Sequence, residues 1–294
     1  MLAPRVVTVS RRTELDELLA RHGTRGAADY FLRQRGRELG EVQERHDAQV
    51  AALRAVGGAV PPDWRRGHVD RGDLPRFLFA AEDTVIAVGQ DGLVANVAKY
   101  LDGQPVIGVN PEPGRNPGVL VRHPPSAVGR LLRGGAPVER RTMVVAELDD
   151  GQELHGLNDI YYGHPAHQSS RYQLSTADGS PERQSSSGVV VGTGSGATGW
   201  CASISRSRAD TDPPTLPGVC EGALCWFVRE AWPSPATGVS STAGRLTAGP
   251  RLELVSESDR LVVFADGLEA DRLELSWGQR VRIGVATRSL TLVS

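Results

Sequence analysis

An aspartate stands between a buried strand and a helix in VIAVGQDGLVANVAKYL, the segment from Val85 to Leu101. Apolar residues run up to Gly89, and Asp91 and Gly92 follow where the chain turns. A turn of this kind lets backbone amides approach an anion, and it puts a carboxylate at the carboxyl edge of a sheet. That carboxylate can accept the proton of a hydroxyl that attacks a phosphate. The alternative is a plain strand-to-helix turn with Asp91 as its N-cap.

A second polar pair lies in HGLNDIYYG, where Asn158 and Asp159 adjoin the start of a strand. Together their side chains can hold a ribose or an adenine amino group through directed hydrogen bonds. Asn and Asp are also expected in a plain turn before a strand, so this pair alone is a weak signal.

A glycine-rich segment follows a later strand, in SSSGVVVGTGSGATGWCASI. Its glycines alternate with Thr193, Ser195 and Thr198, and a helix is expected to follow. Amides and hydroxyls in such a loop can face a phosphate or a sugar. The alternative is a flexible Gly/Ser linker. Because the segment lies directly between VVV and a tryptophan-bearing helix, it favours a binding loop.

Strands and helices alternate in the first part of the chain and must position the aspartate turn. Thr13 is a candidate N-cap for a helix that stops at Gly23, and PPDWRRGHVDRGD is expected to be a solvated loop. The other expected elements are strands at 5–10, 83–88 and 105–110, a helix-forming stretch at 28–56, and a helix at 93–101. This order favours an open, mostly parallel α/β sheet.

The pattern of apolar and turn-forming residues changes after PEPGRNPG. From about Arg141 onward, short strand-like runs are separated by turn signals, and helical periodicity is sparse apart from a stretch after Ala197. This pattern predicts a mainly antiparallel β-domain that carries the Asn-Asp pair and the glycine-rich loop.

Bulk composition excludes several classes of protein. The formal net charge of −2 gives no electrostatic signal for nucleic acid or for an anionic membrane. No apolar run is long enough to span a bilayer, and the N-terminus lacks a signal-peptide pattern, so we expect a cytoplasmic protein. The 3 cysteines share no CxxC spacing, so a zinc site is not expected. Lys99 is the only lysine, which excludes a Walker-type Gly-Lys-Ser/Thr loop.

In this order, the three polar segments resemble the motifs of the NAD kinase family. Members carry a Gly-Gly-Asp-Gly-Thr turn in an α/β domain, and an Asn-Glu pair and a Gly/Thr-rich loop in a β-sandwich domain. The mitochondrial type and its bacterial relatives are the most similar. Their recurring features have counterparts in ERHDAQV, VIGVNPEPGRNPG, LNDIYYG, SSSGVVVGTGSGATGW and FVREAWPSPATGVSS. The resemblance runs from about Arg5 to the end of the chain.

The resemblance implies a fold and a reaction. It implies an open Rossmann-like α/β domain over residues 1–125, which a C-terminal strand at about 280–294 can complete, and a β-sandwich dinucleotide-binding domain over residues 126–280. The reaction would be ATP- and Mg²⁺-dependent phosphorylation of the adenosine 2′-hydroxyl of NAD to give NADP. NAD and ATP would be the partners, and a homodimer or a higher homo-oligomer is expected.

The resemblance also implies roles for particular residues. Asp91 matches the family's turn aspartate and is the expected general base. The implied substrate-binding residues are Gly92, Asn158, Asp159, Thr193, Ser195, Thr198 and Ser203. The implied residues for the phosphate donor are Gly89, Asn110, Arg115 and Gly118. No protein ligand is assigned to Mg²⁺, which the phosphates would mainly hold.

Three residues depart from the family pattern. Gln90 replaces a glycine and would be restricted if that position needs a positive φ. Leu93 replaces a threonine and removes a hydroxyl that could touch a phosphate, and Asp159 replaces a glutamate and shortens its reach. These changes leave two alternatives open. One is a related kinase that acts on a different hydroxyl, and the other is a nucleotide-binding regulatory protein with weakened catalysis.

Overall fold

The computed structural model describes residues 3–177, 179–208 and 213–294. The chain forms two compact units, one of Met1–Glu139 with Thr291–Ser294 and the other of Arg140–Leu290. The units change at residues 139 and 140, close to the change in sequence pattern at about Arg141 and later than the boundary at 125 that the resemblance implies. Among the described residues, no helix has both the length and the apolar character that crossing a bilayer requires.

A parallel sheet forms the centre of the first unit, in the order β2-β1-β3-β4. Its strands are β1 (Arg5–Ser10), β2 (Arg65–Asp70), β3 (Asp83–Val88) and β4 (Pro105–Val109). The end of β16 (Arg280–Val293) adds to it, because Thr291 and Leu292 pair in parallel with β4. β3 is buried along nearly its whole length, as expected of a central strand covered by helices on both faces.

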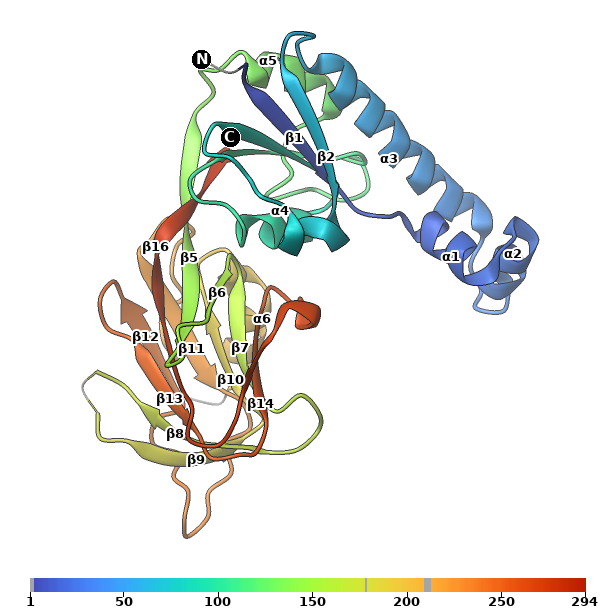
Figure 1. Cartoon of the computed structure of the whole chain (residues 1–294). Coiled ribbons are helices and arrows are strands. Elements are labelled where there is room, and N and C mark those ends of the chain that lie inside the picture. The colour runs from blue at the N-terminus through green and yellow to red at the C-terminus, as the bar shows by residue number, and fades with distance from the viewer. Residues whose placement is uncertain (1–2, 178, 209–212) are drawn as a thin grey trace. The chain divides into compact units, whose positions relative to one another are not determined.

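Helices cover both faces of this sheet (Figure 1). On one face, Ala52 and Val56 of α3 and Leu131 of α5 pack against Ile86 and Val88 of β3. The other face is covered by α4, which contacts β1, β3 and β4. The bounds of these helices are Leu39–Ala59 for α3, Asp91–Ala98 for α4 and Val128–Leu132 for α5.

Two shorter helices, α1 (Glu14–His22) and α2 (Arg25–Arg33), pack on the first half of α3, away from the sheet (Figure 1). Thr13 caps α1 and Gly23 ends it, as the sequence predicts. Two 3₁₀ turns complete the unit, η1 (Arg71–Arg76) and η2 (Pro125–Ala127).

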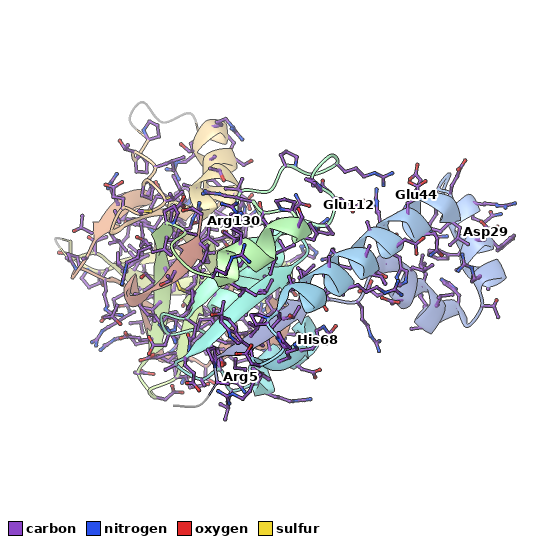
Figure 2. The ribbon with its side chains drawn as sticks, turned by 90° about the horizontal axis from the view of Figure 1, so that it is seen from above. Arg5, Asp29, Glu44, His68, Glu112 and Arg130 are labelled. Carbon is purple, nitrogen blue, oxygen red and sulfur yellow. The ribbon has the colours of Figure 1, made fainter. Side chains whose placement is uncertain are left out.

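The predicted strands at 5–10, 83–88 and 105–110 are confirmed, and the predicted helix at 93–101 begins and ends earlier, at 91 and 98. The expectation of a loop in PPDWRRGHVDRGD is wrong, because β2 lies there and pairs with β1, with Thr8 opposite His68. Figure 2 labels Arg5 and His68 on these two neighbouring strands. As the end strand of this sheet, β2 keeps most of its polar side chains partly or fully exposed, so its sequence lacks an apolar run.

Two antiparallel sheets form the second unit. One has the order β12-β11-β10-β7-β14-β15, and in the other β16 pairs with β13, β13 with β8 and β8 with β9. Their strands are β5 (Val138–Leu148), β6 (Glu153–Gly156), β7 (Asp159–Gly163), β8 (Ser170–Ser175), β9 (Glu182–Ser186), β10 (Val189–Gly192), β11 (Ala223–Val228), β12 (Ala243–Thr247), β13 (Leu252–Ser256), β14 (Leu261–Ala265) and β15 (Leu273–Leu275).

The two sheets share one apolar core. Tyr162 of β7 packs edge-on against Tyr172 of β8, with Val191, Leu254 and Ile283 in the same cluster. A mixed α/β unit and an antiparallel two-sheet unit agree with the predicted class of an α/β domain plus a β-sandwich. The helical elements of the second unit are η3 (Gly196–Thr198), α6 (Trp200–Ser207) and η4 (Glu269–Asp271).

Candidate functional site

Asp91, the expected general base, is the first residue of α4 and is bonded to the loop after β4. Its Oδ1 accepts the backbone amides of Val119, Leu120 and Val121 at 3.1, 2.8 and 3.0 Å. Its Oδ2 accepts the amide of Val119 at 3.0 Å. The carboxylate therefore anchors residues 119–121 against the N-terminus of α4, and only one of these bonds ends on Oδ2.

Two of the residues predicted to bind the phosphate donor hold the first half of the same loop. Asn110 is buried, and its Nδ2 donates to the carbonyl of Asn116 at 2.6 Å while its Oδ1 accepts the amide of Glu112 at 2.9 Å. Arg115 is exposed and pairs with Glu44 of α3 at 3.1 Å. Figure 2 labels Glu44 on the helix and Glu112 in the loop. In this structure both predicted residues make contacts within the first unit.

Gly118 allows the loop to fold back on itself. A Cβ at this position would overlap the backbone of Val121, one of the residues that Asp91 binds. Gly89 is also closely packed, since a Cβ there would lie 3.3 Å from Cδ2 of Leu93. Leu93 is 3% exposed, so the position that the family fills with threonine faces the interior here.

The expected restriction at Gln90 does not exist. Its backbone has φ −103° and ψ 166°, an extended conformation open to any residue. Gln90 is the N-cap of α4 but makes no side-chain capping bond. Its Oε1 instead accepts a hydrogen bond from Nη2 of Arg11 at 3.3 Å.

In the second unit, one aspartate shapes the turn that carries Asn158 and Asp159. The carboxylate of Asp266 accepts the backbone amides of Leu157, Asn158 and Asp159 at 3.0, 2.6 and 3.3 Å. Asp266 itself has φ 54°, in the left-handed region that aspartate tolerates better than most residues. Three consecutive amides therefore point at one carboxylate, which fixes the backbone of the turn.

The carboxyl of Asp159 is electrostatically unusual. Burial raises its pKa to about 7, and the negative charge of Asp266 contributes to the rise. A carboxyl with such a pKa changes its charge near neutral pH. Perturbed carboxyls of this kind are found preferentially at functional sites.

The glycine-rich loop is tied to the same turn through Thr193, which is fully buried. Its hydroxyl donates to the carbonyl of Leu157 at 2.5 Å and accepts the amide of Ser195 at 3.1 Å. The amide of Thr193 donates to the carbonyl of Asn158 at 2.9 Å. At Gly196, a Cβ would overlap that same carbonyl, so the glycine permits the close approach of the two segments.

The structure thus brings Asn158, Asp159, Thr193 and Ser195 together, with Nη1 of Arg141 at 3.4 Å from Oγ of Ser195. The other two predicted contact residues of this loop lie further along the chain. Thr198 and Ser203 are exposed, at the end of η3 and within α6.

Local sequence pattern does not identify some of the residues that shape the structure around these sites. The local sequence of Asp266 is that of a plain β-turn, and the one signal is that FADG repeats the Asp-Gly pair of the first turn. Arg141 is buried to 1% exposure, and nothing in its local sequence distinguishes it from the other arginines. His46 of α3 is half-buried, and its Nδ1 lies 2.8 Å from Oγ1 of Thr13.

Within the described ranges, no group of three or more His, Cys, Asp or Glu side chains comes together in a way that could hold a metal ion. The polar groups of both sites are amides, hydroxyls, carboxylates and arginines. These groups suit a ligand that carries phosphates and sugar hydroxyls.

The curated proteins that the chain is similar to are NAD kinases. The chain is 30% identical to the mitochondrial NAD kinase 2 of Rattus norvegicus over 259 residues, which cover 70% of this chain and 61% of that protein. It is 26% identical to the NAD kinase of Clostridium tetani over 204 residues, 65% of this chain and 68% of that one. With the NAD kinase of Chlorobaculum tepidum it shares 25% identity over 127 residues, 41% and 44% of the two chains. No protein-family model matches the chain.

Proposed function

Since this chain belongs to the NAD kinase family, we propose that it transfers the terminal phosphoryl group of ATP to the adenosine 2′-hydroxyl of NAD, giving NADP. The chain spans 61% of the length of the rat relative. ATP enters as its Mg²⁺ complex, so the metal is part of the substrate.

The dinucleotide is assigned to the second unit. The observation that carries this assignment is the hydrogen-bonded frame in which Asp266 holds the turn at Asn158 and Asp159, and Thr193 ties the glycine-rich loop to it. A rigid frame of amides, hydroxyls and a carboxyl can hold ribose hydroxyls and an adenine amino group in one orientation. Asn158 and Asp159 are the residues that contact the dinucleotide in this proposal.

The role of general base is assigned to Asp91. As the 2′-oxygen attacks the terminal phosphorus of ATP, ADP leaves with the electrons of the broken P–O bond, and the hydroxyl proton passes to the carboxylate. Oδ2 is the accepting oxygen, since three of the four amide contacts end on Oδ1. The amide contacts orient the carboxylate and limit its motion. Backbone amides and arginines offset the phosphoryl charge in place of a loop lysine.

One observation favours a second candidate function. The carboxylate of Asp91 is already engaged by three amides, which is the arrangement expected of a structural anchor. A protein that uses Asp91 only in this way would bind the dinucleotide without turnover. This alternative is a nucleotide-binding regulatory protein.

The test is an assay of the purified protein with NAD, ATP and Mg²⁺, in which NADP is followed by a dehydrogenase that accepts only NADP. We expect NADP to form, and we expect Asp91→Asn to lower its rate by about 10²–10⁴-fold, the usual contribution of a general base. Asparagine keeps an oxygen for the loop amides but cannot take the proton. Asp102→Asn is the control, because Asp102 is exposed in the same unit. Binding of NAD with no NADP formed would instead support the regulatory alternative.

A further inference from the structure

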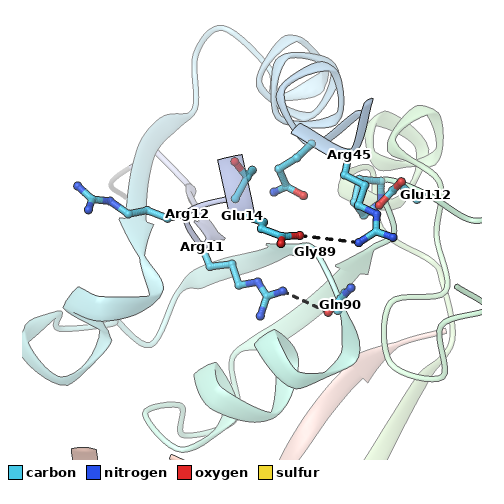
Figure 3. A pocket seen from close by; sticks show the side chains of 10 residues that line it. Arg11, Arg12, Glu14, Arg45, Gly89, Gln90 and Glu112 are labelled. Atoms are coloured by element: carbon cyan, nitrogen blue, oxygen red, sulfur yellow. Dashed lines mark hydrogen bonds and ion pairs between the residues drawn. The ribbon is translucent and has the colours of Figure 1, made fainter. Parts of the chain in front are cut away.

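The first unit contains a cavity that the proposed function has not yet assigned to a ligand. Of the residues implied for substrate or donor binding, only Gly89 lines it. It has a volume of about 120 Å³, where a water molecule needs roughly 10–15 Å³. The side chains that line it include Arg11, Arg45, Gln49 and Gln90 (Figure 3). It therefore has room for a phosphoryl group in place of several waters, and eight of the ten residues that line it are of polar or charged types.

The cavity lies where the order of the strands reverses. From β1 the chain continues to β2 on one side of β1 and then returns to β3 on its other side. In open α/β sheets, ligands bind at this point, beyond the carboxyl ends of the two central strands. The loops after β1, β3 and β4 all contribute to the cavity, with Arg11 and Arg12, Gly89 and Gln90, and Pro111 and Glu112.

The guanidinium groups of the cavity favour an anion. Arg11 contacts the neutral amide of Gln90, and among the described residues no carboxylate forms an ion pair with it. Figure 3 shows Arg45 directed toward Glu14, and the two are 4.0 Å apart. Arg12 points away from both of the other arginines in the same view.

Two carboxylates also line the cavity, and both have partners of opposite charge. Glu14 takes a two-fold hydrogen bond from Arg37 at 2.5 and 2.9 Å in addition to its contact with Arg45. Glu112 lies 3.9 Å from Arg115. Their negative charge is therefore offset largely by arginines outside the cavity. Arg11 has no carboxylate partner among the described residues, and Arg45 has only the 4.0 Å contact with Glu14, which a phosphate group can replace.

The N-terminus of α4 adds to this preference at the wall formed by Gly89 and Gln90. Gln90 is the N-cap of α4 and makes no side-chain capping bond, so the positive end of this helix lies beside the cavity. Arginine side chains together with such an end are a usual combination for binding phosphate groups.

We propose that this cavity binds the phosphate chain of the donor through the side chains of Arg11 and Arg45. The proposal rests on the proposed function, because it names the place where ATP is held, and it adds residues that the family resemblance did not imply. The contact between Gln90 and Arg11 gives Gln90 a second role. Its amide oxygen accepts a hydrogen bond from the Arg11 guanidinium, at a position where the family has a glycine with no side chain.

The experiment measures binding of inorganic triphosphate with Mg²⁺, and separately of NAD, to the full chain by calorimetry. Arg11→Gln and Arg45→Gln are each expected to weaken triphosphate binding about tenfold and to lower its salt dependence, with NAD binding unchanged. Arg54→Gln is the matched control, since Arg54 is an exposed arginine of the same helix α3 outside the cavity. Unchanged melting temperatures show that the variants are folded.

The outcomes separate this proposal from the proposed function. If the wild type does not bind triphosphate, or if Arg11→Gln and Arg45→Gln bind it as the wild type does, the cavity is not the donor site. NADP formation in the same preparation would then leave the kinase activity standing. If triphosphate binds through both arginines but no NADP forms, the cavity is a phosphate-chain site and the assigned acceptor is wrong.

Discussion

Replacing Asp266 by asparagine is expected to change how dinucleotide binding depends on pH. Burial and the charge of Asp266 together bring the pKa of Asp159 to about 7. An ionised carboxylate accepts hydrogen bonds from ribose hydroxyls or an adenine amino group more strongly than a neutral carboxyl does. NAD should therefore bind best to the form with Asp159 ionised.

The magnitude follows from the fraction of ionised protein. With a pKa of about 7, one molecule in about eleven has the ionised carboxylate at pH 6, and about ten in eleven have it at pH 8. An apparent dissociation constant scales inversely with the binding-competent fraction, so NAD binding should weaken about tenfold from pH 8 to pH 6. Asp266→Asn removes the neighbouring charge but leaves the burial, so the midpoint should fall below 7 and the profile should flatten over this range.

Calorimetric titration of NAD at half-unit steps from pH 5.5 to 8.5 checks both statements. Asparagine keeps one oxygen for the amides of the turn, and thermal unfolding of the variant shows whether the frame is intact. Asp259→Asn serves as the control, because Asp259 is an exposed carboxylate of the same unit. A flat profile in the wild type, or the same midpoint in wild type and Asp266→Asn, would refute the reasoning.

The same pKa has a consequence for stability. Asp159 binds a proton more tightly in the folded chain, with a pKa of about 7, than at its ordinary value of 3.8. The stabilisation from this proton is complete below pH 3.8 and is lost as the pH rises to 7. It amounts to about 4 kcal/mol at most, and Asp159→Asn should remove this pH dependence in urea unfolding curves.

Three further substitutions test the packing of the two sites and of the first sheet. Gly118→Ala should cost about 1–3 kcal/mol in urea unfolding, because its Cβ would overlap the backbone of the anchored loop, whereas Gly114→Ala, with open space around it, should be neutral. Thr193→Val should lower stability by about 2 kcal/mol and weaken NAD binding in calorimetry, while the exposed Thr198→Val should change stability by less than about 0.5 kcal/mol. Asp83→Asn should cost about 3 kcal/mol by thermal unfolding, since its buried carboxylate pairs with a guanidinium.

The sequence predicts the buried strands of the first unit well and its end strand badly. Strands such as DTVIAV carry continuous apolar runs because helices cover both of their faces. The strand RRGHVD has no such run, because it pairs on one side only and its charged side chains reach water. Its place in the sheet depends on pairing with β1, a contact between residues about sixty positions apart that local pattern does not report.

The candidate site residues could be named from the sequence, but their partners could not. Asp91 bonds to amides 28 to 30 residues further on, and Asp266 to amides 107 to 109 residues earlier. Such contacts are set by how the loops fold back. The raised pKa of Asp159 could not be predicted from the sequence for the same reason, since it depends on burial and on the charge of Asp266.

Both units use an aspartate at a turn to collect three consecutive backbone amides, Asp91 from residues 119–121 and Asp266 from residues 157–159. Alanine at either position would leave these amides without their acceptor, at a cost of about 1–3 kcal/mol for each one that stays buried. Loss of activity in an alanine variant would then report a loop that has moved as much as a missing base. Asparagine keeps an acceptor oxygen and removes the charge. If Asp91→Asn keeps its melting temperature and its triphosphate binding but loses NADP formation, the carboxylate does chemistry in addition to anchoring the loop. If Asp91→Asn retains full activity, its role is structural and the base lies elsewhere.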